Sequence, residues 1–281
     1  MRAIGQQTIL ITGATGGLGR RLALDLGTAG ALVLVHGRDA GRAEQVRKEV
    51  EAVGGRAETV VADLASLRAV DALAEEVLSR FDRLDVLVNN AAAGGGAPGG
   101  GREVSADGYE LRFAVNHLAA RHLSRRLLPL LRASAPARIV DVASAGQAPV
   151  DFDDPQLERH YDGIAAYCQS KLAMIASGFA LAEEVRGSGV SVTSLHPATF
   201  MATTMVRESG ITPTSTVEEG ARAALRLIRD PSGGGVADEV SGRYFNGTAE
   251  ARAQAWAYDA EARSRLVELS DGLIAQALAT G

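Results

Sequence analysis

The chain has 281 residues, of which 46% are hydrophobic and 22% charged, so it is long and apolar enough to fold around a sizeable core. The formal net charge of −5, without any run of Lys or Arg, argues against nucleic acid as a partner. A single cysteine, Cys168, excludes an intrachain disulfide, and no apolar stretch is long enough for a signal peptide or a membrane span, so we expect a cytoplasmic protein.

Short runs rich in Val, Leu and Ile alternate with helical patterns from the first residues almost to the last. We expect strands at residues 8–12, 31–36, 58–62, 84–88, 138–142, 190–195 and 242–245. Helices are expected at residues 20–29, 40–53, 66–80, 107–131, 161–185 and 217–229. Because the strands are almost continuously apolar, they are typical of a parallel sheet covered by helices on both faces. The alternation predicts an α/β fold, a single Rossmann-type, doubly wound domain of about seven strands over residues 1–248, with residues 249–281 as a helical tail packed on it.

A glycine-rich segment at residues 12–19 (TGATGGLG) follows the first strand and opens the first helix. Glycines there allow a tight turn, close approach of the backbone to a pyrophosphate and close packing of helix on strand. The first helical N–H groups then offer a partial positive charge to phosphates. The spacing is G-x-x-x-G-x-G rather than G-x-G-x-x-G, and a purely structural turn is the alternative. The strand-turn-helix context favours a dinucleotide site.

The end of the second strand, His36-Gly37-Arg38-Asp39, predicts which dinucleotide binds. An NAD-specific site places an acid at this position to bind the adenosine ribose. Gly37 stands where that acid is expected, and Arg38 beside it carries a planar guanidinium that matches a phosphate. These residues favour NADP(H). The alternative is that Arg38 only solvates a loop and Asp39 binds the ribose, which would make NAD(H) the cofactor.

The pentapeptide Tyr167-Cys168-Gln169-Ser170-Lys171 sets a phenol and an ammonium four residues apart. On a helix this spacing puts both side chains on one face. A nearby cation favours the phenolate, so we expect a lowered pKa for Tyr167. A tyrosine tuned in this way can give a proton to a carbonyl oxygen or take one from an alcohol. An exposed helical pair is the ordinary alternative for Y-x-x-x-K taken alone.

In their order and context, these motifs resemble those of the short-chain dehydrogenase/reductase family over residues 8–245. The matching motifs are the glycine turn at residues 12–19, Asp63-Leu64, Asn89-Asn90-Ala91-Ala92, Val115-Asn116, Ser144, Tyr167-x-x-x-Lys171 and Pro197-Ala198. Ala92 and Ala198 stand where the family has glycine. The long gap between Ser144 and Tyr167, and the Val-Asn-His-Leu at 115–118, are similar to the retinol-dehydrogenase-like and protochlorophyllide-reductase-like branches.

The resemblance implies a division of labour among these residues. Tyr167 would be the general acid or base, Lys171 would lower its pKa and bind the nicotinamide ribose, Ser144 would bind the substrate oxygen, and Asn116 would kink its helix and hold a water. The resemblance and Arg38 together predict that the dinucleotide is contacted by Gly13, Thr15, Gly16, Gly17, Leu18, Gly19, Arg38, Asp63, Leu64, Asn90, Ala91, Tyr167, Lys171, Pro197 and Thr199. No zinc spacing relates the histidines to one another or to Cys168, so no metal is expected.

The predicted activity is that of an NADP(H)-dependent oxidoreductase that interconverts a carbonyl and an alcohol on a fairly bulky, apolar small molecule. An NAD(H)-dependent alcohol dehydrogenase, an extended relative acting on nucleotide sugars and a non-catalytic dinucleotide sensor are the alternatives, and a homo-oligomer is compatible with the sequence. Three irregular segments, residues 94–101, 145–162 and 200–216, are expected to form the substrate loops. For residues 94–101, a solvated linker is the alternative interpretation. In the last, Phe200, Met201 and Met205 predict a mobile lid with an apolar inner face, unless they pack onto the core.

Overall fold

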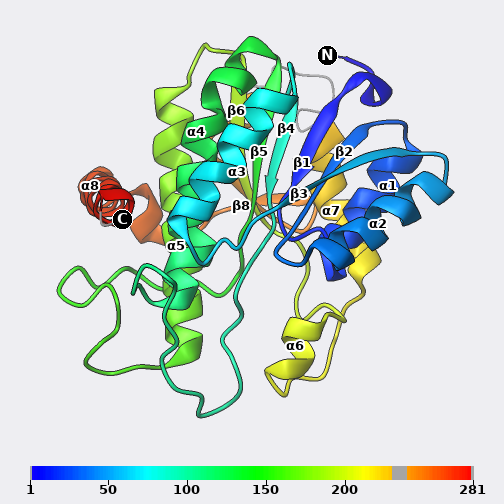
Figure 1. Cartoon of the computed structure of the whole chain (residues 1–281). Coiled ribbons are helices and arrows are strands. Elements are labelled where there is room, and N and C mark those ends of the chain that lie inside the picture. The colour runs from blue at the N-terminus through cyan, green and yellow to red at the C-terminus, as the bar shows by residue number, and fades with distance from the viewer. Residues whose placement is uncertain (1, 230–238, 280–281) are drawn as a thin grey trace.

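The computed structural model describes residues 2–229 and 239–279 of the chain. Its strands are β1 (Thr8–Ile11), β2 (Leu32–Gly37), β3 (Arg56–Val61), β4 (Val86–Asn89), β5 (Ala137–Val142), β6 (Val190–His196), β7 (Arg243–Asn246) and β8 (Ala249–Ala251). Its α-helices are α1 (Gly17–Thr28), α2 (Ala40–Ala52), α3 (Leu67–Arg80), α4 (Ala119–Ala133), α5 (Gly163–Glu184), α6 (Thr204–Glu208), α7 (Val217–Arg229) and α8 (Ala260–Ala279). Figure 1 shows them in one α/β domain.

The strands form one sheet in the order β3-β2-β1-β4-β5-β6-β7-β8. Strands β1 to β7 pair in parallel, and β8 pairs antiparallel with β7. The order reverses between β1 and β4, which is the point where ligands bind in doubly wound sheets. The predicted Rossmann-type fold is therefore confirmed, with one strand more than expected.

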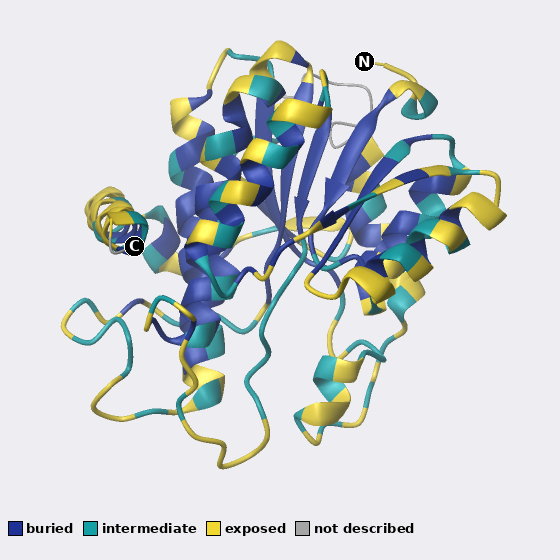
Figure 2. Cartoon of the chain, in the orientation of Figure 1, coloured by how far each residue is buried: buried dark blue, intermediate teal, exposed yellow. Residues whose placement is uncertain are grey.

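Helices cover both faces of the sheet (Figure 1): α1, α2 and α7 lie on one side, and α3, α4 and α5 on the other. Successive residues of a strand point to opposite faces. Accordingly Ile9 and Ile11 belong to the core beneath α1, whereas Leu10 belongs to the core beneath α3 and α4. Figure 2 shows the central strands buried along their length between these layers, and β1, β4, β5 and β6 have no exposed residue, which is why their sequences lack a regular polar alternation. The strands β3, β7 and β8, toward the edges of the sheet, carry exposed residues.

Three elements differ from the sequence-based expectation. Strand β8 lies in the segment expected to be a helical tail, of which residues 280–281 lie outside the described residues. The helix expected from residue 107 begins instead with a π-helix, η2 (Phe113–Leu118), that continues into α4. The segment 200–216 contains a short helix, α6.

Helix α5 is long and apolar enough to cross a membrane by length and composition, with a mean hydropathy of 1.2, and it alone meets this test in the described part of the chain. The sequence was expected to contain no such segment. However, 72% of the apolar window is buried inside the protein, where α5 packs against η2, β6 and α8. Packing on several sides at once accounts for its composition.

Candidate active site

The glycine turn at residues 12–19 lies at the carboxyl end of β1, where the strand order reverses. Gly13 has φ +65°, and a Cβ there would lie 2.8 Å from the Cα of Ala91. A Cβ at Gly19 would overlap the carbonyl oxygen of Gly13 and lie 2.5 Å from the Nδ2 of Asn90. Both glycines are therefore required by close approach of the turn to the end of β4, as the motif predicts.

Thr12 and Asn90 fasten this turn to the neighbouring strand. The Thr12 hydroxyl donates to the carbonyl of Val88 at 3.2 Å and accepts from the backbone N–H groups of Asn90 and Ala91 at 2.9 and 3.0 Å. The Asn90 side chain donates to the carbonyl of Thr12 at 2.8 Å. These hydrogen bonds hold together the carboxyl ends of β1 and β4, between which the strand order reverses.

His36 is a further member of the turn that the sequence motif did not reveal. It is 2% exposed, and its Nδ1 accepts from the N–H of Gly13 at 3.1 Å, which leaves Nε2–H to donate to the carbonyl of Ala62 at 3.1 Å. Burial lowers the pKa of His36 to about 4. The neutral ring links the ends of β1, β2 and β3.

We expect the stability of the protein to fall as pH falls from 6.5 to about 4, in part because of His36. The unfolded chain binds a proton at the ordinary pKa of 6.5, whereas the folded chain binds it only near 4, so acid favours unfolding by up to about 3 kcal/mol at this site. Urea titrations at several pH values should show a flatter pH dependence for His36→Gln. The exposed His160→Gln variant serves as control, and an unchanged slope in His36→Gln would contradict the assignment.

The start of α1 fits the phosphates of a dinucleotide. Its N-cap residue is Gly16, so no side chain caps the first-turn N–H groups. No acidic residue lies in the first turn to compete with an anion. Uncapped N–H groups at a helix N-terminus, reached through glycines, are a phosphate site, and the residues present therefore fit a nicotinamide dinucleotide.

At the end of β2, some residues favour NADP(H) over NAD(H), whereas Gly37 is explained by packing. A Cβ at Gly37 would overlap the Cγ2 of Thr15, so packing alone explains the absence of an acid there. The Asp39 carboxylate caps α2 by accepting from the N–H of Arg42 at 2.9 Å, which argues against its binding a ribose. Arg38 is exposed beside the turn. Arg42, one helical turn later, is also exposed and donates to the carbonyl of Thr15 at 3.3 Å.

The remaining predicted cofactor residues lie at the same edge of the sheet. Asp63 follows β3 and is exposed, with its Oδ1 accepting from the N–H of Ala65 at 3.0 Å, while Leu64 is buried. Pro197 follows β6 and is buried. Thr199 shares a hydrogen bond with His196 at 3.0 Å. The structure thus brings the predicted segments to one edge.

Asn116 lies within η2, so its helix does depart from α-helical winding at that point. Its Oδ1 accepts from the N–H of Ala93 at 2.7 Å, and its Nδ2 donates to the carbonyl of Ala93 at 3.0 Å. Nδ2 also donates to the Oγ of Ser170 at 2.9 Å, and Ser170 donates to the carbonyl of Tyr167. Asn116 therefore joins the chain after β4 to the helix that carries Tyr167.

Tyr167 and Ser144 meet at the carboxyl end of β5. Ser144 is buried, and its Oγ accepts from the N–H of Gly146 at 3.0 Å. Burial raises the pKa of Tyr167, while a hydrogen bond with Ser144 lowers it. The predicted lowering of the Tyr167 pKa by Lys171 is wrong for this conformation, because the Lys171 Nζ donates to the carbonyl of Val142 at 2.7 Å and lies 5.9 Å from the centre of the phenol ring.

Lys171 is coupled to an acid that the sequence analysis did not single out. Both Lys171 and Asp141 are buried, and burial lowers the pKa of Lys171 to about 8 while the charge of Asp141 opposes that shift. Burial raises the pKa of Asp141 to about 6, opposed by a hydrogen bond from Asn89 and by the charge of Lys171. The carboxylate thus helps to keep the lysine protonated.

Two signals in the sequence could have revealed the missed residues. Asp141 is a charged residue inside an apolar run (RIVDV), and such a residue in a buried strand needs a partner. Arg42 lies in the first turn of the helix predicted to follow the second strand, so a second guanidinium close to the end of that strand could have been expected beside Arg38. His36 had no comparable signal, because its partners come from two other strands.

Comparisons with known proteins agree with this geometry. The short chain dehydrogenase family model matches residues 7–213. Retinol dehydrogenase 13 of Mus musculus is 36% identical across 98% of this chain and 86% of its own length, and retinol dehydrogenases 11, 12 and 14 also match.

Solved structures with bound dinucleotides are similar to this one. A Beutenbergia cavernae protein, provisionally assigned as an NAD(P)-dependent gluconate 5-dehydrogenase and holding NADP, is 32% identical across 86% of this chain and 94% of its own, with a TM-score of 0.68. The 3-ketoacyl-(acyl-carrier-protein) reductase of Brucella melitensis, complexed with NADH, is 25% identical across 86% and 97% of the two chains, with a TM-score of 0.68. From its motifs, fold and relatives, the chain is an oxidoreductase of the short-chain dehydrogenase family, in the branch that resembles retinol dehydrogenases.

Proposed function

We propose that this oxidoreductase uses NADP(H) to interconvert a carbonyl and an alcohol on a bulky, apolar substrate, with Tyr167 as acid and base. The observation that carries the proposal is the meeting of Ser144, Tyr167, Lys171 and Asn116 at the edge of the sheet beside the glycine turn. This set also argues against a non-catalytic dinucleotide sensor, because a sensor has no need of a hydrogen-bonded serine and tyrosine with a buried lysine beneath them.

In the reducing direction, the Ser144 hydroxyl donates a hydrogen bond to the substrate carbonyl oxygen and holds it near Tyr167. The nicotinamide, when bound, supplies the hydride that the carbonyl carbon accepts. As negative charge develops on the oxygen, the Tyr167 O–H transfers its proton to it and becomes a phenolate. The raised pKa of Tyr167 keeps the phenol protonated beforehand. For the Lys171 charge to stabilise the phenolate, its ammonium, which here donates to the carbonyl of Val142, must turn toward the Tyr167 oxygen as the phenolate forms.

Exposed guanidinium groups support the choice of NADP(H). Arg38 and Arg42 flank the turn where the adenosine ribose of a dinucleotide would lie, and the Asp39 carboxylate is engaged in capping α2. Two arginines can each form charge-assisted bonds with a 2′-phosphate, whereas NADH offers them only hydroxyls. An NAD(H)-dependent enzyme is the alternative. Exposed arginines at this position favour NADP(H) without requiring it, and one structural neighbour holds NADH.

We expect Arg38→Ala to raise the Kd for NADPH by about ten- to a hundredfold, the loss of one hydrogen bond to a charged group, and to leave the Kd for NADH nearly unchanged. Arg42→Ala should weaken both cofactors, NADPH more, because Arg42 also supports the carbonyl of Thr15. Fluorescence titration measures both constants. Lys48→Ala, an exposed cation further along α2, is the control. Equal loss of NADH and NADPH in Arg38→Ala would contradict the cofactor assignment.

Apolar side chains around the site support a bulky, apolar substrate. Ile164, one turn before Tyr167, is 66% exposed, and Phe200, at the start of the 200–216 segment, is 45% exposed. Met205 of α6 lies against the backbone of Gly94. Met201 instead packs against the core, so the predicted apolar inner face rests on Phe200 and Met205. Large exposed apolar residues gathered near a site indicate an apolar ligand.

The segment 200–216 is proposed to act as a lid. Phe200 has φ +46°, a conformation that side chains other than glycine rarely adopt, and Thr203 lies against Gly17 of the glycine turn. The segment therefore starts from a strained residue and, three residues later, lies against the glycine turn. We expect hydrogen exchange across 200–216 to slow when NADPH and an unreactive substrate analogue bind together. Unchanged exchange in that ternary complex would exclude a lid.

The activity itself is tested by measuring NADPH and NADH oxidation with a panel of aldehydes, cyclic ketones, steroids and quinones, paired with small aliphatic carbonyls. The proposal expects higher kcat/KM for the larger apolar members, with NADPH preferred. Absence of turnover with every carbonyl would exclude the proposed activity.

A cytoplasmic location is also part of the proposal. Fractionation of cells that express the chain tests this location, and recovery of the protein in the membrane fraction would contradict it.

A further inference from the structure

Arg112 is a buried cation beside the site that the catalytic scheme does not use. It directly precedes η2 and is 3% exposed. Burying a charge is costly unless partners compensate it. Its partners therefore show what this arginine is placed to do.

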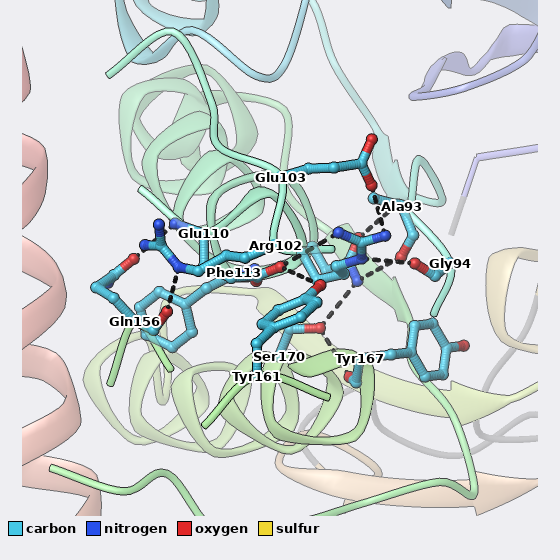
Figure 3. A network of polar contacts seen from close by, with 12 residues as sticks. Ala93, Gly94, Arg102, Glu103, Glu110, Phe113, Gln156, Tyr161, Tyr167 and Ser170 are labelled. Atoms are coloured by element: carbon cyan, nitrogen blue, oxygen red, sulfur yellow. Dashed lines mark hydrogen bonds and ion pairs between the residues drawn. The ribbon is translucent and has the colours of Figure 1, made fainter. Parts of the chain in front are cut away.

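The partners of Arg112 include residues of two of the predicted substrate loops, Gly94 and Tyr161, together with Glu103 and Glu110 (Figure 3). Its Nε donates to the carbonyl of Gly94 at 2.8 Å, and its Nη2 pairs with the exposed carboxylate of Glu103 at 2.7 Å. Its Nη1 lies 3.5 Å from the Oε1 of Glu110, which is 1% exposed. Tyr161, from the 145–162 segment, donates to the same Glu110 oxygen at 3.3 Å, and its ring centre lies 5.9 Å from the guanidinium.

The backbone held by Arg112 lies between the catalytic helix and α6. Gly94 lies against Met205 of α6, and a Cβ at Gly95 would lie 3.5 Å from the Cα of Ile164, one turn before Tyr167. At Gly96, which has φ +79°, a Cβ would lie 2.8 Å from the Nη2 of Arg112. Residues 94–96, which we name the glycine wall, are thus packed on the guanidinium, so this part of the 94–101 segment is not the free linker that its composition suggests.

Arg112 and Asn116 both form hydrogen bonds with the backbone of the same stretch of chain. Asn116 binds both the N–H and the carbonyl of Ala93, and Arg112, four residues earlier, binds the next carbonyl, that of Gly94. Glu110 completes the arrangement, because its Oε2 also accepts from the N–H of Phe113 at 2.7 Å. Figure 3 shows these contacts beside those that link Ala93 through Asn116 to Ser170 and the carbonyl of Tyr167, and the chain from Ala93 to Gly94 joins the two sets.

We propose that Arg112 is a positioning residue for the substrate: together with Glu110 it fixes the glycine wall against the start of α5 and thereby shapes the pocket for a bulky carbonyl compound. This inference rests on the proposed function for its substrate. It predicts that loss of Arg112 loosens the wall and weakens substrate binding, while the acid/base residues and the glycine turn remain in place. If the ion pair were purely structural, its loss would instead lower the stability of the protein and weaken turnover, substrate binding and NADPH binding together.

The test compares Arg112→Met with Arg112→Met/Glu110→Gln, in which no buried carboxylate is left uncompensated, so we expect the double variant to fold. Arg125→Met, which removes an exposed ion pair between Arg125 of α4 and Glu184 of α5, is the matched control. Hydrogen exchange of residues 93–101 in the protein without ligands should become about tenfold faster or more in both Arg112 variants, from the loss of one charged hydrogen bond, and stay unchanged in the control.

Steady-state kinetics should show KM for a bulky apolar carbonyl raised by about tenfold or more, with kcat changed less and the Kd for NADPH unchanged. KM for a small aliphatic carbonyl should rise less. Unchanged exchange at residues 93–101, or faster exchange without a change in KM, would overturn the inference. Because exchange needs no substrate, it tests the wall even if the wild-type enzyme reduces no carbonyl, a result that would instead refute the proposed function.

Discussion

Replacing Tyr167 with phenylalanine is expected to lower kcat for carbonyl reduction by about two or more orders of magnitude, the usual range for a lost acid or base group. Phenylalanine keeps the ring that packs above Lys171 and removes only the hydroxyl that hydrogen-bonds with Ser144. Without a proton donor, the alkoxide formed by hydride transfer has no nearby acid. The Kd for NADPH should change little, because the glycine turn and the arginines lie on other elements. Single-turnover NADPH oxidation with the best carbonyl of the panel measures the chemical step.

Tyr258→Phe is the matched control, since it removes a phenol hydroxyl that accepts from the N–H of Ala253 in the C-terminal region. It should retain turnover. Ser144→Ala should also lower kcat, through loss of the hydrogen bond that places the substrate oxygen. A Tyr167→Phe enzyme that keeps most of its turnover would remove Tyr167 from the mechanism and leave Ser144 and Lys171 without the acid they are arranged around.

The second large effect is expected from Gly19→Ala, which should abolish or strongly weaken dinucleotide binding. The added methyl group would overlap the Gly13 carbonyl oxygen and approach the Asn90 Nδ2, both of which are held in place by the link between β1 and β4. Backbone atoms cannot move aside as a flexible side chain can, so α1 must shift and its N–H groups leave the phosphate position. Overpacking of this kind costs about 1–3 kcal/mol or more, so a lower melting temperature should accompany the rise in Kd.

Gly272→Ala provides the control for this substitution. Gly272 lies within α8 with open space around its Cα, so alanine there should be neutral or stabilise the helix slightly. Normal NADPH affinity in Gly19→Ala would show that the turn tolerates a side chain and that the cofactor binds elsewhere. Reduced stability with normal affinity would show that the glycine serves only the packing of α1.

Much of the architecture could be predicted from the chain alone, because local patterns report which faces are buried. Helix α7 has the predicted bounds, and strands β1 to β7 lie within two residues of the predicted ones. Apolar runs broken by a glycine turn predict a covered parallel sheet whatever the partners are. The family motifs likewise placed Tyr167, Ser144 and the turn at one edge, since the carboxyl ends of parallel strands meet there.

Other features are decided only by contacts between residues distant in the sequence. The π-helix forms where Asn116 engages Ala93, and β8 pairs with β7 although its three residues carry no strand pattern. The pKa of Tyr167 depends on where the Lys171 ammonium turns, and the spacing of the two residues does not encode that direction. Arg112 is one arginine among many until the glycine wall folds onto it. Periodicity reports burial along one element, whereas pKa values, hydrogen bonds and loop positions depend on which atoms of other elements fill the space around a side chain, and only the tertiary structure determines those.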